Sequence, residues 1–164
     1  MKKVYDKARR LLSSVTPLKA DCGQLCGKNC CKGDSRTGML LFPNEKTTLD
    51  VIENNGRRLA VCHEKCERNE RPLGCMMFPF FPVEDGGIKI VPDYRGINIC
   101  PMVAHRDEIK FSKRFMRRMR SAGKALYSDP ECAAFMREIA DEIEDARKIN
   151  ELIKIKNEQG DFYG

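Results

Sequence analysis

Tryptophan is absent from this chain of 164 residues, histidine occurs twice, and aromatic residues make up only 7% of the sequence. No apolar run reaches the roughly 18 residues that suggest a membrane-spanning helix, and Met1–Lys7 lacks the apolar core of a secretory signal. We therefore expect no membrane partner and a cytoplasmic location. The shortage of aromatic residues predicts a modest core, and the length predicts a single domain over residues 1–164.

Cysteine, in contrast, is abundant, with nine residues, four of which fall within residues 22–31. Cys132 lies on an apolar helical stripe, so we expect it to be a core residue. The other eight are the candidate metal ligands: Cys22, Cys26, Cys30, Cys31, Cys62, Cys66, Cys75 and Cys100. Clustered thiols in a reducing compartment indicate bound metal rather than disulfides.

Eight sulfur ligands make two sets of four, and sites built only from sulfur hold zinc or iron–sulfur clusters. The chain has no Cys-x2-Cys pair typical of zinc knuckles, whereas an adjacent pair and a Cys-Pro are familiar around iron–sulfur clusters. We predict one or two iron–sulfur clusters of the 4Fe–4S type, with zinc as the alternative. If residues 22–30 are helical, Cys22, Cys26 and Cys30 share one face. Cys31 then points away from that face, so Cys30 and Cys31 are divided between two centres.

The two histidines, His63 and His105, are weaker candidates because the cysteines already suffice as ligands. The sequence also offers no Ser-His-Asp arrangement and no glycine-rich phosphate loop. A catalytic residue therefore cannot be assigned from motifs.

Basic residues form a block without any acidic residue between positions 112 and 124. Its members are Lys113, Arg114, Arg117, Arg118, Arg120 and Lys124. Such a block can bind an acidic partner, a small anionic ligand or nucleic acid, and a solvated helix face accounts for it equally well. Aromatic residues for base stacking are scarce around it.

The periodicity predicts an α+β fold, in which a small irregular Cys-rich region with short strands packs on N-terminal and C-terminal helices. We assign the metal-binding core to residues 20–101 and the helical part to residues 103–160. Expected helices cover 4–15, 45–53, a segment after 103 and a long segment after 130. Expected strands cover 39–42, 57–61, 80–83 and 88–91, the last two as a hairpin.

The cysteine spacing carries a resemblance to a known family. Cys22, Cys26 and Cys30-Cys31, then Cys62 and Cys66, then Arg71-Pro72-Leu73-Gly74-Cys75 with Phe78-Pro79, resemble the YkgJ-like family of zinc- or iron-chelating domains. The hallmark of that family is a Cys-rich cluster ending in Cys-Cys, followed by Arg-Pro-x-x-Cys and Phe-Pro. The resemblance covers roughly residues 20–101 and implies metal binding.

A similar cluster occurs in flagellin lysine N-methylases, so the resemblance also implies a candidate activity, cluster-dependent methyl transfer from S-adenosylmethionine. Three hypotheses follow for the function. The chain is a metal- or cluster-carrying protein, a methyltransferase of that kind, or a structural-zinc module that binds nucleic acid through its basic helix.

Overall fold

The computed structural model describes residues 2–20, 22–34, 38–63 and 67–160. Its longer helices are α1 (Lys2–Leu12), α5 (Lys113–Tyr127) and α6 (Pro130–Gly160). Shorter helical segments are α2 (Gly23–Cys26), α3 (Leu73–Met77), α4 (Pro101–Ala104), η1 (Asn29–Cys31), η2 (Arg68–Glu70) and η3 (Tyr94–Gly96). The strands are β1 (Met39–Leu40), β2 (Asp50–Asn54), β3 (Arg57–Val61), β4 (Phe80–Glu84) and β5 (Ile88–Pro92). The fold class is α+β, as the sequence predicts.

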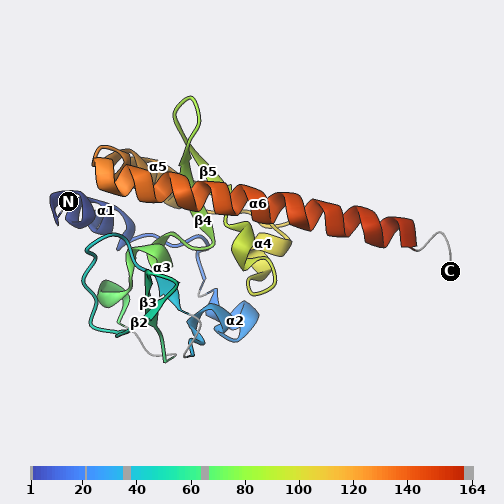
Figure 1. Ribbon diagram of the computed structural model, residues 1–164, viewed down its shortest axis with the longest axis horizontal. Helices are drawn as coiled ribbons and strands as arrows, with labels where there is room; N and C mark the ends of the chain where they lie inside the picture. The colour runs from blue at the N-terminus through green and yellow to red at the C-terminus, as the bar shows by residue number, and fades with distance from the viewer. Residues whose placement is uncertain (1, 21, 35–37, 64–66, 161–164) are drawn as a thin grey trace.

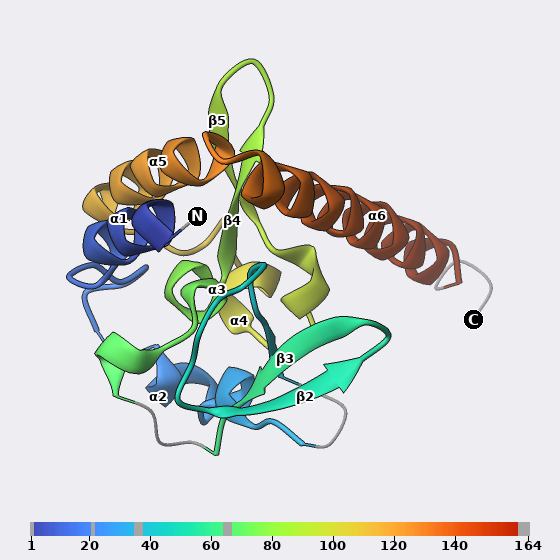
Figure 2. The ribbon, with the colours of Figure 1, turned by 60° about the vertical axis from the view of Figure 1, so that its left-hand side comes forward.

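The longer helices and the β4–β5 hairpin form one side of the molecule, and α2 with the β1–β3 sheet forms the other (Figures 1 and 2). Helix α1 packs along α5, and both α5 and α6 pack against the hairpin. Their apolar residues recur at intervals of three and four, which places one face of each helix in a shared core. That core includes Leu12, Phe115, Met119, Met136 and Ile139.

Strands β1, β3 and β2 form an antiparallel sheet in that order. Asn55 and Gly56 both have positive φ angles, 51° and 74°, and form the two-residue turn of the β2–β3 hairpin. The predicted helix over residues 45–53 is therefore wrong, because residues 50–54 pair with β3. The predicted strand at 57–61 and the hairpin of β4 and β5 are confirmed.

Helix boundaries at the C-terminal side depend on capping residues. Ser112 accepts a hydrogen bond from the Phe115 amide at 3.3 Å, so α5 begins ten residues after position 103. Asp129, rather than Ser128, caps α6 by accepting bonds from the amides of Glu131 and Cys132 at 3.2 and 3.1 Å. Within the described residues, no helix is long and apolar enough to cross a membrane.

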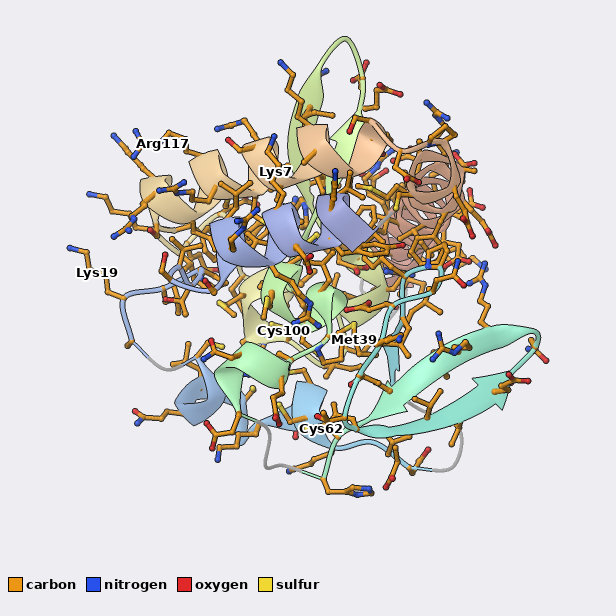
Figure 3. The ribbon with its side chains drawn as sticks, turned by 90° about the vertical axis from the view of Figure 1, so that its left-hand side faces the viewer. Lys7, Lys19, Met39, Cys62, Cys100 and Arg117 are labelled. Atoms are coloured by element: carbon orange, nitrogen blue, oxygen red, sulfur yellow. The ribbon has the colours of Figure 1, made fainter. Side chains whose placement is uncertain are left out.

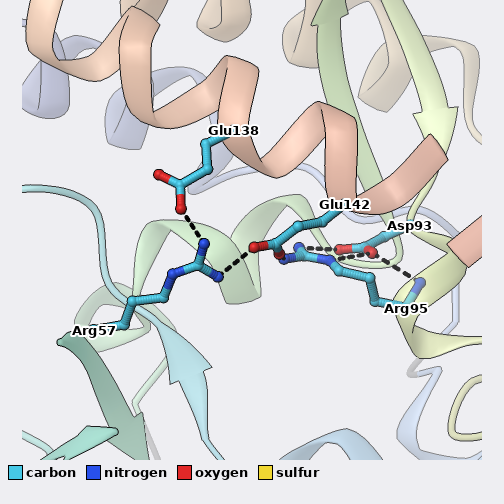
Figure 4. A network of polar contacts seen from close by, with 5 residues as sticks. All are labelled: Arg57, Asp93, Arg95, Glu138 and Glu142. Carbon is cyan, nitrogen blue, oxygen red and sulfur yellow. Dashed lines mark hydrogen bonds and ion pairs between the residues drawn. The ribbon is translucent and has the colours of Figure 1, made fainter. Parts of the chain in front are cut away.

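A network of charged side chains joins the sheet to α6 (Figure 4). Arg57 of β3 pairs with Glu138 and Glu142 of α6. Glu142 also pairs with Arg95 at 3.0 Å, and Arg95 pairs with Asp93 at 2.8 Å. Glu142 thus bridges two arginines, Arg57 on β3 and Arg95 on η3. These pairs fix α6 relative to both elements.

Candidate metal centre

The first cysteine segment is divided between two turns. Cys22 precedes α2 and Cys26 ends it, with the Cys26 sulfur 3.9 Å from the Cys22 carbonyl oxygen. Gly27 and Lys28 then adopt left-handed conformations with φ of 56° and 59°, which ends the helix. A continuous helix over residues 22–30, the condition for three sulfurs on one face, is therefore absent from this described segment.

Cys30 and Cys31 lie on η1, and their sulfur atoms are 4.0 Å apart. Zinc–sulfur bonds of about 2.3 Å in a tetrahedral site separate the sulfurs by about 3.8 Å. The observed spacing is therefore close to that of two ligands on one tetrahedral ion.

A backbone contact brings Cys62 to this pair. Lys32 and His63 form an isolated antiparallel bridge, and the Gly33 amide donates to the Cys62 carbonyl at 3.2 Å. The residues flanking Cys31 and Cys62 are thereby aligned, and the Cys62 thiol hydrogen-bonds the Cys31 sulfur. Cys31 consequently has a candidate ligand on either side, Cys30 from its own segment and Cys62 from a distant one.

The charge distribution around Cys31 favours its thiolate. A hydrogen bond from Cys30, the positive charges of Arg71 and Lys28, and the bond from Cys62 lower the pKa of Cys31 to about 6, although partial burial opposes them. The pKa of Cys30 is raised by its hydrogen bond with Cys31 and by the neighbouring sulfurs. The thiolate is the form of cysteine that binds metals.

Cys100 belongs to a second, apolar group of residues. It is 4% exposed and packs in a cluster with Met102 and Val103, against which Cys22 and Phe78 also pack. Burial raises the pKa of Cys100, the backbone amides of Met102 and Val103 lower it, and the nearby Cys26 raises it. Cys22 and Cys26 therefore both lie near Cys100.

Cys75 is half-buried on α3, and a buried carboxylate fixes the start of that helix. Glu45 is 3% exposed, and its Oε1 accepts from the Leu73 amide at 2.7 Å and from Arg9 at 3.2 Å. Its Oε2 accepts from the Phe42 amide at 3.0 Å. Glu45 thus joins α1, the end of the β1 segment and the helix that carries Cys75.

The remaining candidates are readily placed. Cys66 lies outside the described residues. The His63 ring lies 3.0 Å from Asp50 and the His105 ring 3.2 Å from Glu108, and both histidines are exposed. Cys132 is fully buried on α6 and donates to the Tyr5 hydroxyl at 3.2 Å, which confirms it as a core residue.

Figure 3 shows Cys62 and Cys100 in the half of the molecule below α1 and α5. Across the described residues, no group of three or more Cys, His, Asp and Glu side chains converges closely enough to hold a metal ion by itself. The donor chemistry fits a soft metal, because the neighbouring groups are thiols and one of them favours the thiolate.

Sequence reasoning missed two residues that shape this region. Lys28 lowers the pKa of Cys31, and Glu45 positions α3. A lone acidic residue two positions after the apolar run Leu40-Leu41-Phe42-Pro43 was the available signal for Glu45.

The fold and the thiol groups together define an α+β protein with a cysteine-rich candidate metal centre. Comparison of the chain with models of known families, with curated proteins and with solved structures finds no match.

Proposed function

We propose that this chain is a metal-binding protein that resembles the YkgJ-like family and holds one or two iron–sulfur clusters on its eight clustered cysteines, with zinc as the alternative. The observation that carries the proposal is the position of Cys31, whose sulfur lies 4.0 Å from that of Cys30 and hydrogen-bonds the Cys62 thiol. Cys30 and the charge of Arg71 both lower the pKa of Cys31. A sulfur-ligated centre requires several thiolates that distant segments of the chain hold close together. A reducing cytoplasm keeps such thiols available.

The contacts support a division of ligands into two groups. Cys30, Cys31 and Cys62 would hold one centre and Cys22, Cys26 and Cys100 the other, with Cys66 and Cys75 completing the eight. A 4Fe–4S cluster would supply one-electron transfer, whereas zinc would only stabilise the fold. Cys30 is exposed and Cys100 is buried, so the first centre would face solvent and the second would be shielded.

Anaerobic purification followed by iron, sulfide and zinc analysis tests the proposal. Iron and sulfide in equal amounts with broad visible absorption identify clusters, and zinc without sulfide identifies the alternative. Protein that contains neither after growth with both metals contradicts metal binding. Saturable binding of S-adenosylmethionine to the iron-loaded protein would support the methyltransferase hypothesis.

A second candidate function, nucleic-acid binding, has its own observation. The six cations of α5 named above are all exposed, and among the described side chains none of them pairs with an acid. Cations elsewhere do pair: Arg57, Arg95, Arg137 and Arg147 each contact a carboxylate. Lys7 of α1 and Lys19 lie on the same side of the molecule as Arg117 (Figure 3).

The chemistry of this basic face favours a phosphate backbone over an acidic protein. Protein interfaces usually have an apolar centre, whereas the outward residues of α5 are basic or serine. Phe115 is buried and Phe111 partly buried, so neither offers a platform for base stacking. Arg120 and Lys124 also line a shallow, open depression together with Glu84, where a small anion could bind instead.

Titration of labelled duplex DNA and duplex RNA at several salt concentrations tests this second function. Arg117→Gln should weaken binding and reduce the slope of log affinity against log salt by about one, whereas Lys154→Gln on α6 should do neither. Equal effects of the two variants, or no binding of either duplex at low salt, would rule out nucleic-acid binding by this surface. Competition by free phosphate alone would assign the surface to a small anion.

A further inference from the structure

The distal part of α6 exposes an apolar stripe. Ile143 is 3% exposed and packs in the core, but no side chain of residues 144–158, all within the described part of α6, is buried. Ile149, Leu152, Ile153 and Ile155 are 56%, 61%, 51% and 48% exposed. Figures 1 and 2 show this part of the helix extending beyond the rest of the molecule. Contiguous exposed aliphatic side chains of this kind usually mark an interaction surface.

The stripe has the spacing of a helix-pairing seam. Asp145, Ile149, Leu152 and Lys156 recur at intervals of four, three and four, so they share one face of the helix. Ile153 and Ile155 flank that face on either side. The opposite face is neutralised within the helix, because Arg147 pairs with Glu144 and Glu151. The seam therefore has an apolar centre, a base at one end and, at the other, an acid that also lies 3.8 Å from Lys148 of the same helix.

We infer that α6 mediates self-association, with the seam of one copy packed antiparallel against that of a second copy. One register places Ile149 of each copy against Leu152 of the other, and the same register places Asp145 against Lys156 at both ends. A parallel pair would instead place Asp145 against Asp145 and Lys156 against Lys156, and like charges at this distance repel. The charges thus select a second copy in the antiparallel direction.

The predicted interface is short, so the association should be weak and concentration-dependent. Its contacts lie entirely on α6, and the inference does not depend on the metal proposal. Because the two copies of α6 would meet only after Ile143, association would leave the core of each copy unchanged.

Sedimentation equilibrium of the full chain over a concentration series tests the inference. We expect a reversible dimer, and Leu152→Asp should leave only monomer. Asp145→Lys and Lys156→Asp should each weaken association about tenfold, because two symmetric attractions become repulsions. The double variant carrying both changes should restore wild-type association. Lys154→Asp, on the opposite face, is the control with the same change in charge and should have no effect.

Circular dichroism of each variant establishes that α6 remains helical. Single charge variants that associate like wild type would overturn the antiparallel register. A wild-type monomer at every concentration overturns the inference altogether. If that monomer co-sediments with anionic vesicles, the stripe binds a lipid surface instead.

Discussion

Replacement of Glu45 by alanine should be among the most destabilising single substitutions in this protein. Its carboxylate accepts two buried backbone amides, those of Leu73 and Phe42, and pairs with Arg9. Leu73 and Phe42 are 0% and 2% exposed, so water cannot replace the lost acceptor. Alanine would also leave a small cavity beside α3.

Each buried donor left unsatisfied costs about 1–3 kcal/mol, and loss of the partner of a partly buried arginine adds to that cost. We therefore expect Glu45→Ala to reduce the free energy of unfolding by about 3–5 kcal/mol. Glu45→Gln keeps one acceptor oxygen but places an amide donor against a backbone donor, so it should cost roughly half as much. Against a typical stability of about 5–15 kcal/mol, both effects are large.

Urea unfolding followed by circular dichroism, with every variant in the same metal state, measures these changes. Glu84→Gln is the matched control, because Glu84 pairs with Arg137 in an exposed position and should contribute less than about 0.5 kcal/mol. A loss below about 1 kcal/mol in Glu45→Ala would refute the reasoning. It would mean that water or a neighbouring group satisfies these amides.

Three further predictions concern the packing of the helices. Burial raises the pKa of Tyr5, so the unfolded chain loses this proton first as pH rises; stability should fall above about pH 10, and Tyr5→Phe should flatten that fall in urea midpoints. A methyl group at Gly123 would lie 2.6 Å from Cβ of Pro82, so Gly123→Ala should lower stability by about 1–3 kcal/mol in thermal melts. Glu142→Gln weakens both arginine contacts of α6 and should cost about 1 kcal/mol, whereas the exposed Glu151→Gln should cost less in the same urea titration.

The sequence predicted the elements that depend on local signals. The apolar stripes of α1 and α6 and the Asp85-Gly86-Gly87 turn between β4 and β5 all match the structure. Residues 45–53 were misassigned because their own pattern is ambiguous, and the Asn55-Gly56 turn decides their pairing with β3. Glycine is intrinsically unfavourable within a helix, but Gly123 allows α5 to approach the hairpin closely.

The candidate site was predictable only in its chemistry. Cysteine spacing indicated soft donors, but the contact of Cys31 with Cys62 depends on the Lys32–His63 bridge between segments far apart in the chain. This contact arises from tertiary pairing, which periodicity does not encode. The break at Gly27, in contrast, has a local signal, because glycine readily adopts the left-handed conformation that ends a helix.

The most direct test of metal binding is the metal content of anaerobically purified wild type, Cys31→Ser, Cys75→Ser and Cys132→Ser, measured as iron, sulfide and zinc per chain. We predict that wild type contains metal, that Cys31→Ser and Cys75→Ser lose at least one centre, and that Cys132→Ser keeps the wild-type content because its thiol lies in the core. Unchanged stoichiometry in Cys31→Ser and Cys75→Ser, or loss of a centre in Cys132→Ser, would contradict the assignment.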